Sequence, residues 1–197
     1  MNETYYTEEI ARDPNTSPDI LKKILEQGND DAISSYASEN PNCPAYLLEI
    51  VLKRGKDAIV SQYAAQNPNC PAYLLEEVLK RGKDDLISCF AARNPNCPAY
   101  LLEEILKRGE NDIISGFVSE NSNCPAYLLE MVLKRGKNDW VSCYASENPN
   151  CSALAKIEWM RLTGKIGKFD PSIHIMETEI IYKEDPDLQK LRDLINE

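Results

Sequence analysis

The amino-acid sequence predicts an all-α solenoid, a stack of two-helix units of 27 residues each. The first observation behind this prediction is a motif at fixed spacing. Asn-Pro-Asn-Cys-Pro begins at Asn40, Asn67 and Asn94, returns with one change at Asn121, and starts again at Asn148. The second observation is the helical spacing of apolar residues between successive motifs. With a diverged copy at the N-terminal end, the units begin at residues 13, 40, 67, 94, 121 and 148, and positions are numbered from these residues.

The first helix of each unit is expected directly after the motif. In the unit that starts at residue 67 it covers residues 71–81 and begins at Pro71, since proline fits the first helical turn, where its missing N–H costs nothing. Apolar residues at i, i+1, i+4 and i+5 give this helix one apolar face: Leu74, Leu75, Val78 and Leu79. Gly82 follows as the C-terminal stop.

The second helix of each unit is expected to begin at position 18, which holds good N-cap residues: Asp30, Asp57, Asp84, Asn111 and Asn138. In the unit that starts at residue 67 its predicted apolar face consists of Leu86, Ile87, Phe90 and Ala91. The helix ends before the next Asn-Pro, because a residue that precedes proline disfavours the helical region. Neither short helix can bury its apolar face alone, so the units are expected to stack.

The repeated pattern Asn-Pro-Asn-Cys-Pro-Ala-Tyr-Leu-Leu-Glu resembles the bacterial leucine-rich repeat variant family, whose units also carry Asn-Pro followed by a Pro-x-x-Leu-Leu helix. The resemblance covers residues 13–160. It implies a right-handed, HEAT-like superhelix in which α-helices alternate with 3₁₀-like helices. The unit here is longer than the usual family unit, and the cysteine-rich iron–sulfur segment of some members has no counterpart. The resemblance therefore implies a fold and a general role in molecular interaction, but no catalytic residue.

Two regions are expected along the chain. Residues 1–168 form the solenoid with its terminal caps, the last of which contains Trp159 and Met160 in place of the usual aliphatic pair. Residues 169–197 form an extended segment and a short C-terminal helix with Leu188, Leu191 and Ile195 on one side. That helix either packs against the last unit or serves as a peptide for partner binding or self-association.

Composition and charge narrow the class of protein. The 197 residues carry a net charge of −10, and residues 1–39 hold nine acidic and three basic side chains. An acidic chain disfavours nucleic-acid binding, although a local basic strip remains compatible with it. The sequence has no apolar run long enough to cross a bilayer and no visible secretory signal, so we expect a cytoplasmic protein that does not bind membranes.

The cysteines and potential catalytic groups favour a binding protein over an enzyme. The five motif cysteines are Cys43, Cys70, Cys97, Cys124 and Cys151. Packed helices lie about 8–10 Å apart, which is too far for a disulfide between equivalent positions. We expect them to be small buried thiols. No metal site, cofactor or catalytic residue is expected, because the chain has no zinc-binding C-x-x-C, no phosphate-binding loop and a single histidine, His174.

The leading hypothesis is a non-enzymatic scaffold that binds a protein or peptide on its curved surface. On the second helices, positions 19, 22, 23 and 26 are expected to face outward, and their small side chains would form a concave wall. The candidate partner-binding residues from positions 22, 23 and 27 are Ser61, Gln62, Ser88, Cys89, Arg93, Ser115, Gly116, Glu120, Ser142 and Cys143. Crowding on an inner curve explains the small residues equally well.

Two further stripes are expected on the first helices. The outer stripe contains Tyr46, Tyr73, Tyr100 and Tyr127, with Lys53, Lys80, Lys107 and Lys134 on the same side. It is either a contact surface or a structural series in which each tyrosine lies against the preceding unit. Each of these lysines precedes an arginine, and the resulting Lys-Arg row is the alternative site, for nucleic acid. Compensation of the helix dipole by solvated charge also accounts for the row.

Overall fold

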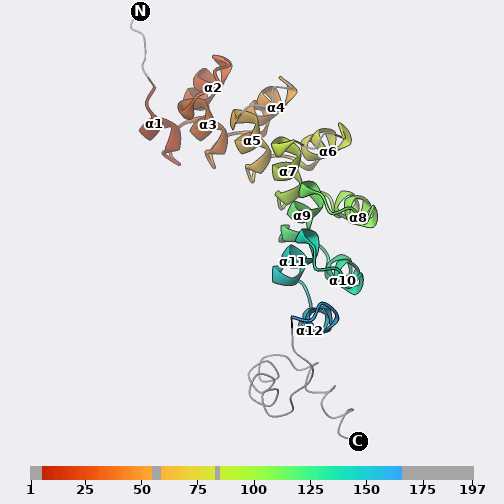
Figure 1. The fold of residues 1–197 in the computed structure, drawn as a ribbon. Coiled ribbons are helices and arrows are strands. Elements are labelled where there is room, and N and C mark those ends of the chain that lie inside the picture. Colours follow the sequence, from red (N-terminus) through yellow and green to blue (C-terminus); the bar gives the residue numbers. More distant parts are fainter. Residues whose placement is uncertain (1–5, 55–58, 83–84, 166–197) are drawn as a thin grey trace, which may run out of the picture.

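The protein is all-helical and curved. A computed structural model describes residues 6–54, 59–82 and 85–165, and every regular element in these ranges is an α-helix. After α1 (Glu8–Arg12), the helices alternate between two rows (Figure 1). The inner row continues with α3 (Ala32–Glu39), α5 (Ile59–Gln66), α7 (Leu86–Arg93), α9 (Ile113–Glu120) and α11 (Trp140–Glu147). The outer row contains α2 (Pro18–Glu26), α4 (Ala45–Lys53), α6 (Ala72–Lys80), α8 (Ala99–Lys107), α10 (Ala126–Lys134) and α12 (Ala153–Leu162).

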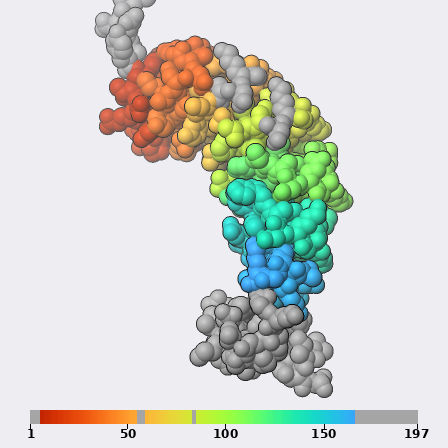
Figure 2. Space-filling model, viewed as in Figure 1, coloured from red at the N-terminus to blue at the C-terminus, as the bar shows by residue number. Residues whose placement is uncertain are grey.

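The inner row lies on the inside of the bend. Figure 1 shows the inner helices along the concave side of the arc and the outer helices along its convex side. Figure 2 shows the same arc as a space-filling model. Consecutive inner helices make extensive contacts with one another, whereas consecutive outer helices touch only lightly. The difference follows from the curvature, since the helices on the outside of an arc must spread apart.

The outer helices confirm the predicted apolar face. In α6, Leu74, Leu75 and Val78 are buried, and the helix ends with Gly82 at φ +64, in the left-handed region that glycine adopts without penalty. The expected start is one residue early, because Pro71 is the N-cap and remains extended at φ −73 and ψ 149. Its carbonyl accepts the hydrogen bond from the Leu74 amide at 3.0 Å, so proline initiates the helix from just outside it.

The predicted N-caps of the inner helices are wrong by one residue. In α7 the N-cap is Asp85, whose carboxylate accepts a hydrogen bond from the Ser88 amide at 2.8 Å. Position 19 plays the same part in α3, α9 and α11, through Asp31, Asp112 and Asp139. The predicted caps were Asp30, Asp57, Asp84, Asn111 and Asn138, of which Asp57 and Asp84 lie outside the described residues. Position 19 is the correct cap because its carboxylate stands three residues before the amide that it accepts.

The inner helices are also rotated relative to the prediction. Leu86, assigned to the apolar face, is 50% exposed, while Ser88 is buried. The reason is the close packing of the inner row: each helix is flanked by two others, and small side chains at the contact let helix axes approach. Ala91 and Ala92 fill the same interface. Hydrophobicity alone predicts that Leu86 is buried and Ser88 exposed. The limited space between neighbouring helices favours the opposite orientation.

Buried asparagines join each unit to the one before it. Asn94 is 2% exposed, and its side-chain nitrogen donates to the carbonyls of Ala65 at 2.7 Å and Asn67 at 3.0 Å. Its side-chain oxygen accepts from the Asn96 amide at 2.8 Å. The equivalent first asparagine makes the same contacts in four other units: Asn40, Asn67, Asn121 and Asn148. The sequence pattern predicts only that this residue ends a helix, and its hydrogen bonds to the preceding unit were not predicted.

The motif cysteines confirm the prediction of buried thiols. Cys43, Cys70, Cys97, Cys124 and Cys151 are all free and buried. Burial raises the pKa of Cys43, Cys70, Cys97 and Cys124 to about 12, because a thiolate is poorly solvated in an apolar core. These side chains are therefore neutral packing groups at physiological pH.

The described part of the chain ends on α12, which packs against α10. Trp159 of this helix is 3% exposed and donates from its indole nitrogen to the Lys137 carbonyl at 2.7 Å. Lys165 lies over the same ring, 4.1 Å from its centroid. The aromatic residue thus fills the space that an aliphatic pair fills in the other outer helices. The expected extended segment and short helix of residues 169–197 lie outside the described residues.

Candidate functional site

The structure separates the predicted partner-binding residues into two groups. Six of them are buried: Ser61, Ser88, Cys89, Ser115, Gly116 and Ser142. The predicted outward orientation of position 22 is therefore wrong, since its serines lie in the interface between inner helices. Gln62, Glu120 and Cys143 are half-buried, and Arg93 is exposed. These four remain on the surface, at positions 23 and 27.

Position 20 takes the exposed place on the inner helices. Its residues are Ile59, Leu86, Ile113 and Trp140, which we call the apolar ladder. They are 56%, 50%, 52% and 58% exposed, respectively, although each is large and hydrophobic. Consecutive members come from consecutive helices of the inner row, and this row lies on the concave side of the arc (Figure 1). Isolated exposed apolar residues are common, but a recurring line of them on one face marks a contact surface.

Half-buried aromatic rings lie one helical turn further along, at position 24: Tyr36, Tyr63, Phe90, Phe117 and Tyr144. The rings of Phe90 and Phe117 are 6.0 Å apart, and Tyr144 meets Trp140 edge-on at 5.1 Å. At the N-terminal end, the Arg12 guanidinium covers the ring of Tyr36 at 3.6 Å. The apolar ladder is thus backed by aromatic side chains whose positions are fixed by packing against the core.

The charges around the apolar ladder are mostly acidic. The five inner helices α3, α5, α7, α9 and α11 contain no lysine, and their single arginine, Arg93, pairs with Glu120 at 3.4 Å. Position 27 also holds Glu39 and Glu147, both exposed. The N-cap carboxylates stand at the other end of each helix, but they already accept backbone hydrogen bonds. The concave face therefore combines apolar and aromatic side chains with a negative edge.

The outer stripe of tyrosines is exposed, as predicted. Tyr46, Tyr73, Tyr100 and Tyr127 are about half exposed, at 46–55%. The Tyr73 hydroxyl donates to Glu49 of the preceding helix at 2.9 Å, and Glu49 also pairs with Lys53. The hydrogen bond from Lys53, and to a lesser extent the one from Tyr73, lowers the pKa of Glu49. The same two bonds raise the pKa of Lys53 and of Tyr73. The tyrosine therefore links two outer helices, which is the structural reading of the stripe.

The same three-residue network recurs in the next two units. Glu76 joins Lys80 to Tyr100, and Glu103 joins Lys107 to Tyr127; in each case hydrogen bonds to the lysine and the tyrosine lower the pKa of the glutamate. All of these groups are largely in solvent, so their attraction is weakened by water and salt. The network spaces neighbouring helices, and it also occupies three of the four lysines of the predicted contact stripe.

The Lys-Arg row is partly paired with acidic side chains and partly bonded to backbone carbonyls. Besides the paired lysines, Arg54 donates to the Leu25 carbonyl at 2.6 Å and Arg81 donates to the Val78 carbonyl at 3.2 Å. Arg108 lies 3.5 Å from Glu104. These arginines satisfy C-terminal carbonyls or acidic partners, as expected for compensation of helix ends. A strip that tracks phosphates needs unpaired positive charge, and three of the four lysines of this row are paired with glutamates.

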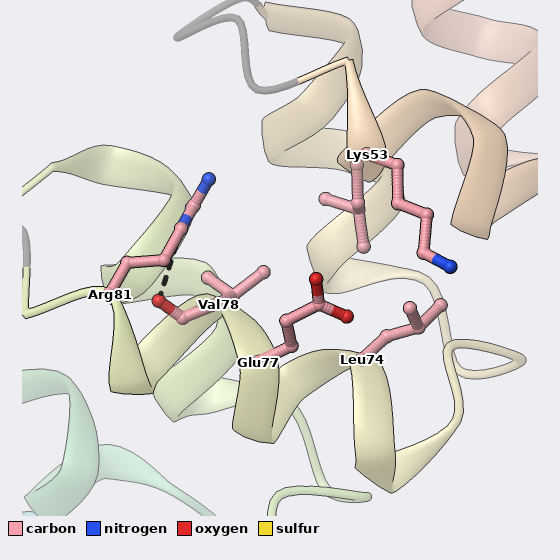
Figure 3. Close-up of a pocket in the computed structure, with 6 residues that line it drawn as sticks. Lys53, Leu74, Glu77, Val78 and Arg81 are labelled. Atoms are coloured by element: carbon pink, nitrogen blue, oxygen red, sulfur yellow. Dashed lines mark hydrogen bonds between the residues drawn. The ribbon is translucent and has the colours of Figure 1, made fainter.

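Shallow hollows separate the outer helices. One of about 140 Å³ lies between α4 and α6 and is lined by Leu52, Lys53, Leu74, Glu77, Val78 and Arg81. Figure 3 shows Glu77 pointing from α6 toward α4, with Arg81 turned to the Val78 carbonyl. These hollows lie between neighbouring outer helices, which are separated on the convex side of the arc. Among the residues that the structure describes, no group of three or more His, Cys, Asp or Glu side chains could hold a metal ion.

Comparison with known proteins adds no further constraint: the sequence matches no known family model, no curated protein and no solved structure. The resemblance to leucine-rich repeat variants is accordingly neither supported nor opposed by a match. Its one testable structural implication is wrong within the described ranges, because the inner helices are α-helical rather than 3₁₀-like. In the same ranges, no helix has both the length and the apolar character that crossing a bilayer requires.

Proposed function

We propose that this chain is a non-enzymatic scaffold, a right-handed solenoid of two-helix, 27-residue units that binds a protein or peptide on its concave face. The buried asparagines support the solenoid, since each donates to a carbonyl 27 residues earlier in the chain. The sequential contacts along the inner row support it as well. Each unit leans on its neighbours, which leaves a long continuous surface available for recognition.

One observation carries the binding proposal: the apolar ladder is exposed in four consecutive inner helices. Leaving a large apolar side chain in water costs about 1.5–3 kcal/mol relative to its burial. The chain could avoid this cost with a polar residue at position 20, as it does at other exposed positions. Tryptophan is among the residues that most often anchor an interface, so Trp140 would be the anchor, and the aliphatic members of the ladder would add apolar contact area beside it.

The proposed surface differs from the one expected from sequence. The apolar ladder and the aromatic rings of position 24 form its centre. Gln62, Arg93, Glu120 and Cys143 stay at its edge, where side chains vary between units on a constant frame. The buried serines of position 22 serve the packing beneath it. This arrangement of an apolar centre with a polar edge is typical of protein interfaces.

A peptide-display selection tests this proposal. The full chain is used to select binders from a random peptide library, and each binder is then measured against Leu86→Ser/Ile113→Ser. We expect the double substitution to abolish binding of most selected peptides while the helicity of the protein stays unchanged. Tyr73→Ser/Tyr100→Ser is the matched control, because these residues are equally exposed but lie on the outer row. Binders that respond only to the tyrosine variant would place the interface on the convex side.

The nucleic-acid alternative receives no support from the paired charges of the Lys-Arg row. It predicts RNA or DNA affinity that falls steeply as salt rises. Absence of binding to single-stranded RNA and duplex DNA at low salt would remove it. Self-association through residues 169–197 is a separate proposal, and a mass measurement in solution on the full chain tests it.

A further inference from the structure

The spacing of the apolar ladder restricts the shape of its partner. Packed helices lie about 8–10 Å apart, and the concave side of an arc has the shorter spacing. The ladder offers one large side chain per inner helix, so its steps repeat at about that distance. A bound segment must therefore place an apolar side chain on one face at intervals of roughly 9 Å.

Only one common backbone conformation fits this interval closely. A polyproline-II helix rises about 3.1 Å per residue with three residues per turn, so residues i and i+3 share a face about 9 Å apart. A β-strand returns to the same face after about 7 Å. An α-helix does so only after about 10.5 Å, and it would also need a groove as wide as its own 10–12 Å diameter.

The chemistry of the concave face agrees with this geometry. Polyproline-II segments dock on grooves lined with aromatic side chains, and position 24 supplies aromatic rings next to the ladder, including Phe90, Phe117 and Tyr144. The edge of the surface carries Glu39 and Glu147, and the one cation in the five inner helices, Arg93, is paired with Glu120. An acidic rim favours a partner with positive charge.

We propose that the concave face binds a basic polyproline-II segment with an apolar side chain at every third residue. This inference rests on the proposed function, since it names the partner of the same surface. The apolar residues of the segment lie on Ile59, Leu86, Ile113 and Trp140, one per helix. Its basic residues lie toward the glutamates of position 27, and its slim backbone lies over the aromatic rings.

Defined peptides test the proposal on the full chain. The first probe is a fluorescently labelled peptide of about five Leu-Pro-Lys triplets, which forms a polyproline-II helix with leucine at every third residue. The second has the same composition in a shuffled order that breaks the three-residue period. The third replaces each lysine with glutamate. Fluorescence anisotropy at physiological salt then gives the three dissociation constants.

We expect the periodic basic peptide to bind about tenfold more tightly than the shuffled one, and the acidic peptide not to bind. Leu86→Ser and Ile113→Ser should each raise the dissociation constant of the periodic peptide about tenfold, while Tyr73→Ser should leave it unchanged. Equal affinity for periodic and shuffled peptides overturns the spacing, because charge alone would then explain the binding. If neither the Leu86 nor the Ile113 substitution changes the affinity, the peptide binds elsewhere and the proposed location on the concave face is wrong.

The display selection separates this inference from the proposed function. If selected peptides depend on Leu86 and Ile113 but lack a three-residue period, the concave face binds a different partner and only the polyproline-II inference fails. If no selected peptide depends on these residues, both proposals fail. A second copy of the chain as the occupant would show as a mass that falls to the monomer in Ile113→Ser, and this result also overturns the inference.

Discussion

Trp140 of α11 lies so close to Gly116 of α9 that a β-carbon on the glycine would stand 2.9 Å from the indole Cδ1. The same atom would be 3.1 Å from the indole nitrogen and 3.3 Å from the Tyr144 ring. Gly116 is the single glycine at position 23, and Trp140 is the largest side chain at position 20. The smallest residue of one unit thus makes room for the largest exposed residue of the next.

This contact predicts a coupled pair of substitutions. In the helix interior, Gly→Ala ordinarily stabilises by about 1 kcal/mol. In Gly116→Ala we expect that gain to be lost, because the indole must leave its position against α9. In the Trp140→Ala background the same change should recover most of the stabilisation, because only the contact with the Tyr144 ring remains. Urea unfolding of the four variants gives the coupling energy, and additive effects would show that the two residues do not touch in solution.

The buried asparagines predict a large loss of stability. Asn94→Ala removes three hydrogen bonds, two of them buried, and leaves the Asn67 carbonyl with only its bond from the Cys70 amide, so we expect a loss of about 3 kcal/mol. Asn96→Ala is the matched control: its side chain also bonds to the preceding unit, at the carbonyls of Pro68 and Cys70, but it is exposed. Water can replace those bonds, so its cost should be nearer 1 kcal/mol. Equal costs for the two variants would contradict this reasoning.

The orientation of the outer helices was predictable because their apolar residues can form only one face. In α6 three large aliphatic residues of the predicted face are buried, and no alternative face is apolar. The inner helices have large residues at positions 20, 21 and 24 and small ones at 22, 25 and 26. Hydrophobicity places Leu86 inside, but a helix packed between two neighbours buries its small side chains instead. The recurrence of Ala and Ser at three positions per unit was the signal for this arrangement.

The exposure of the apolar ladder was not predicted, for the same reason. Once Ser88 was assigned to the exterior, Leu86 was assigned to the core, and the apolar ladder was lost from view. The role of Asn94 was missed for another reason: its partners lie 27 and 29 residues away, and no local rule of helix ending refers to them. The chemistry of a contact between units becomes visible only when the units are placed side by side.

The buried thiols predict a loss of stability at alkaline pH. Cys43, Cys70, Cys97 and Cys124 have a pKa of about 12 in the folded protein, against about 8.5–9 in an unfolded chain. Above pH ~9 the unfolded chain releases protons that the folded protein retains, so the free energy of unfolding falls as pH rises. Below that pH both states keep their protons, and the thiols contribute no pH dependence. Each thiol adds at most about 1.4 kcal/mol per pH unit in this window.

Urea unfolding at pH 8, 9 and 10 under reducing conditions measures this slope. The tyrosines of the outer row add to the loss near pH 10, because hydrogen bonding raises the pKa of Tyr73 in the folded protein above its ordinary value of about 10. Comparison with a cysteine variant therefore isolates the contribution of the thiols. Cys97→Ala removes one buried thiol and should reduce the slope by up to about 1.4 kcal/mol per pH unit. An unchanged slope in this variant would mean that other groups cause the alkaline loss.

The rotation of the inner helices predicts opposite outcomes for two neighbouring residues of α7. Ser88 is buried, and its hydroxyl has no hydrogen-bond partner among the described residues. Ser88→Ala should therefore leave stability unchanged or raise it by up to about 1 kcal/mol, because an unsatisfied polar group is removed. Ser88→Arg should cost more than about 3 kcal/mol, because it forces an unpaired charge between packed helices.

Leu86→Arg provides the comparison on the exposed side of the same helix. Its side chain enters solvent, so the free energy of unfolding should change by no more than about 0.5 kcal/mol, while peptide binding to the concave face is lost. Circular dichroism during urea unfolding measures both stabilities. The orientation predicted from hydrophobicity alone gives the reverse result, with Ser88→Arg tolerated and Leu86→Arg unfolding the chain. The pair of arginine variants therefore distinguishes the two orientations of the inner row without knowledge of any ligand.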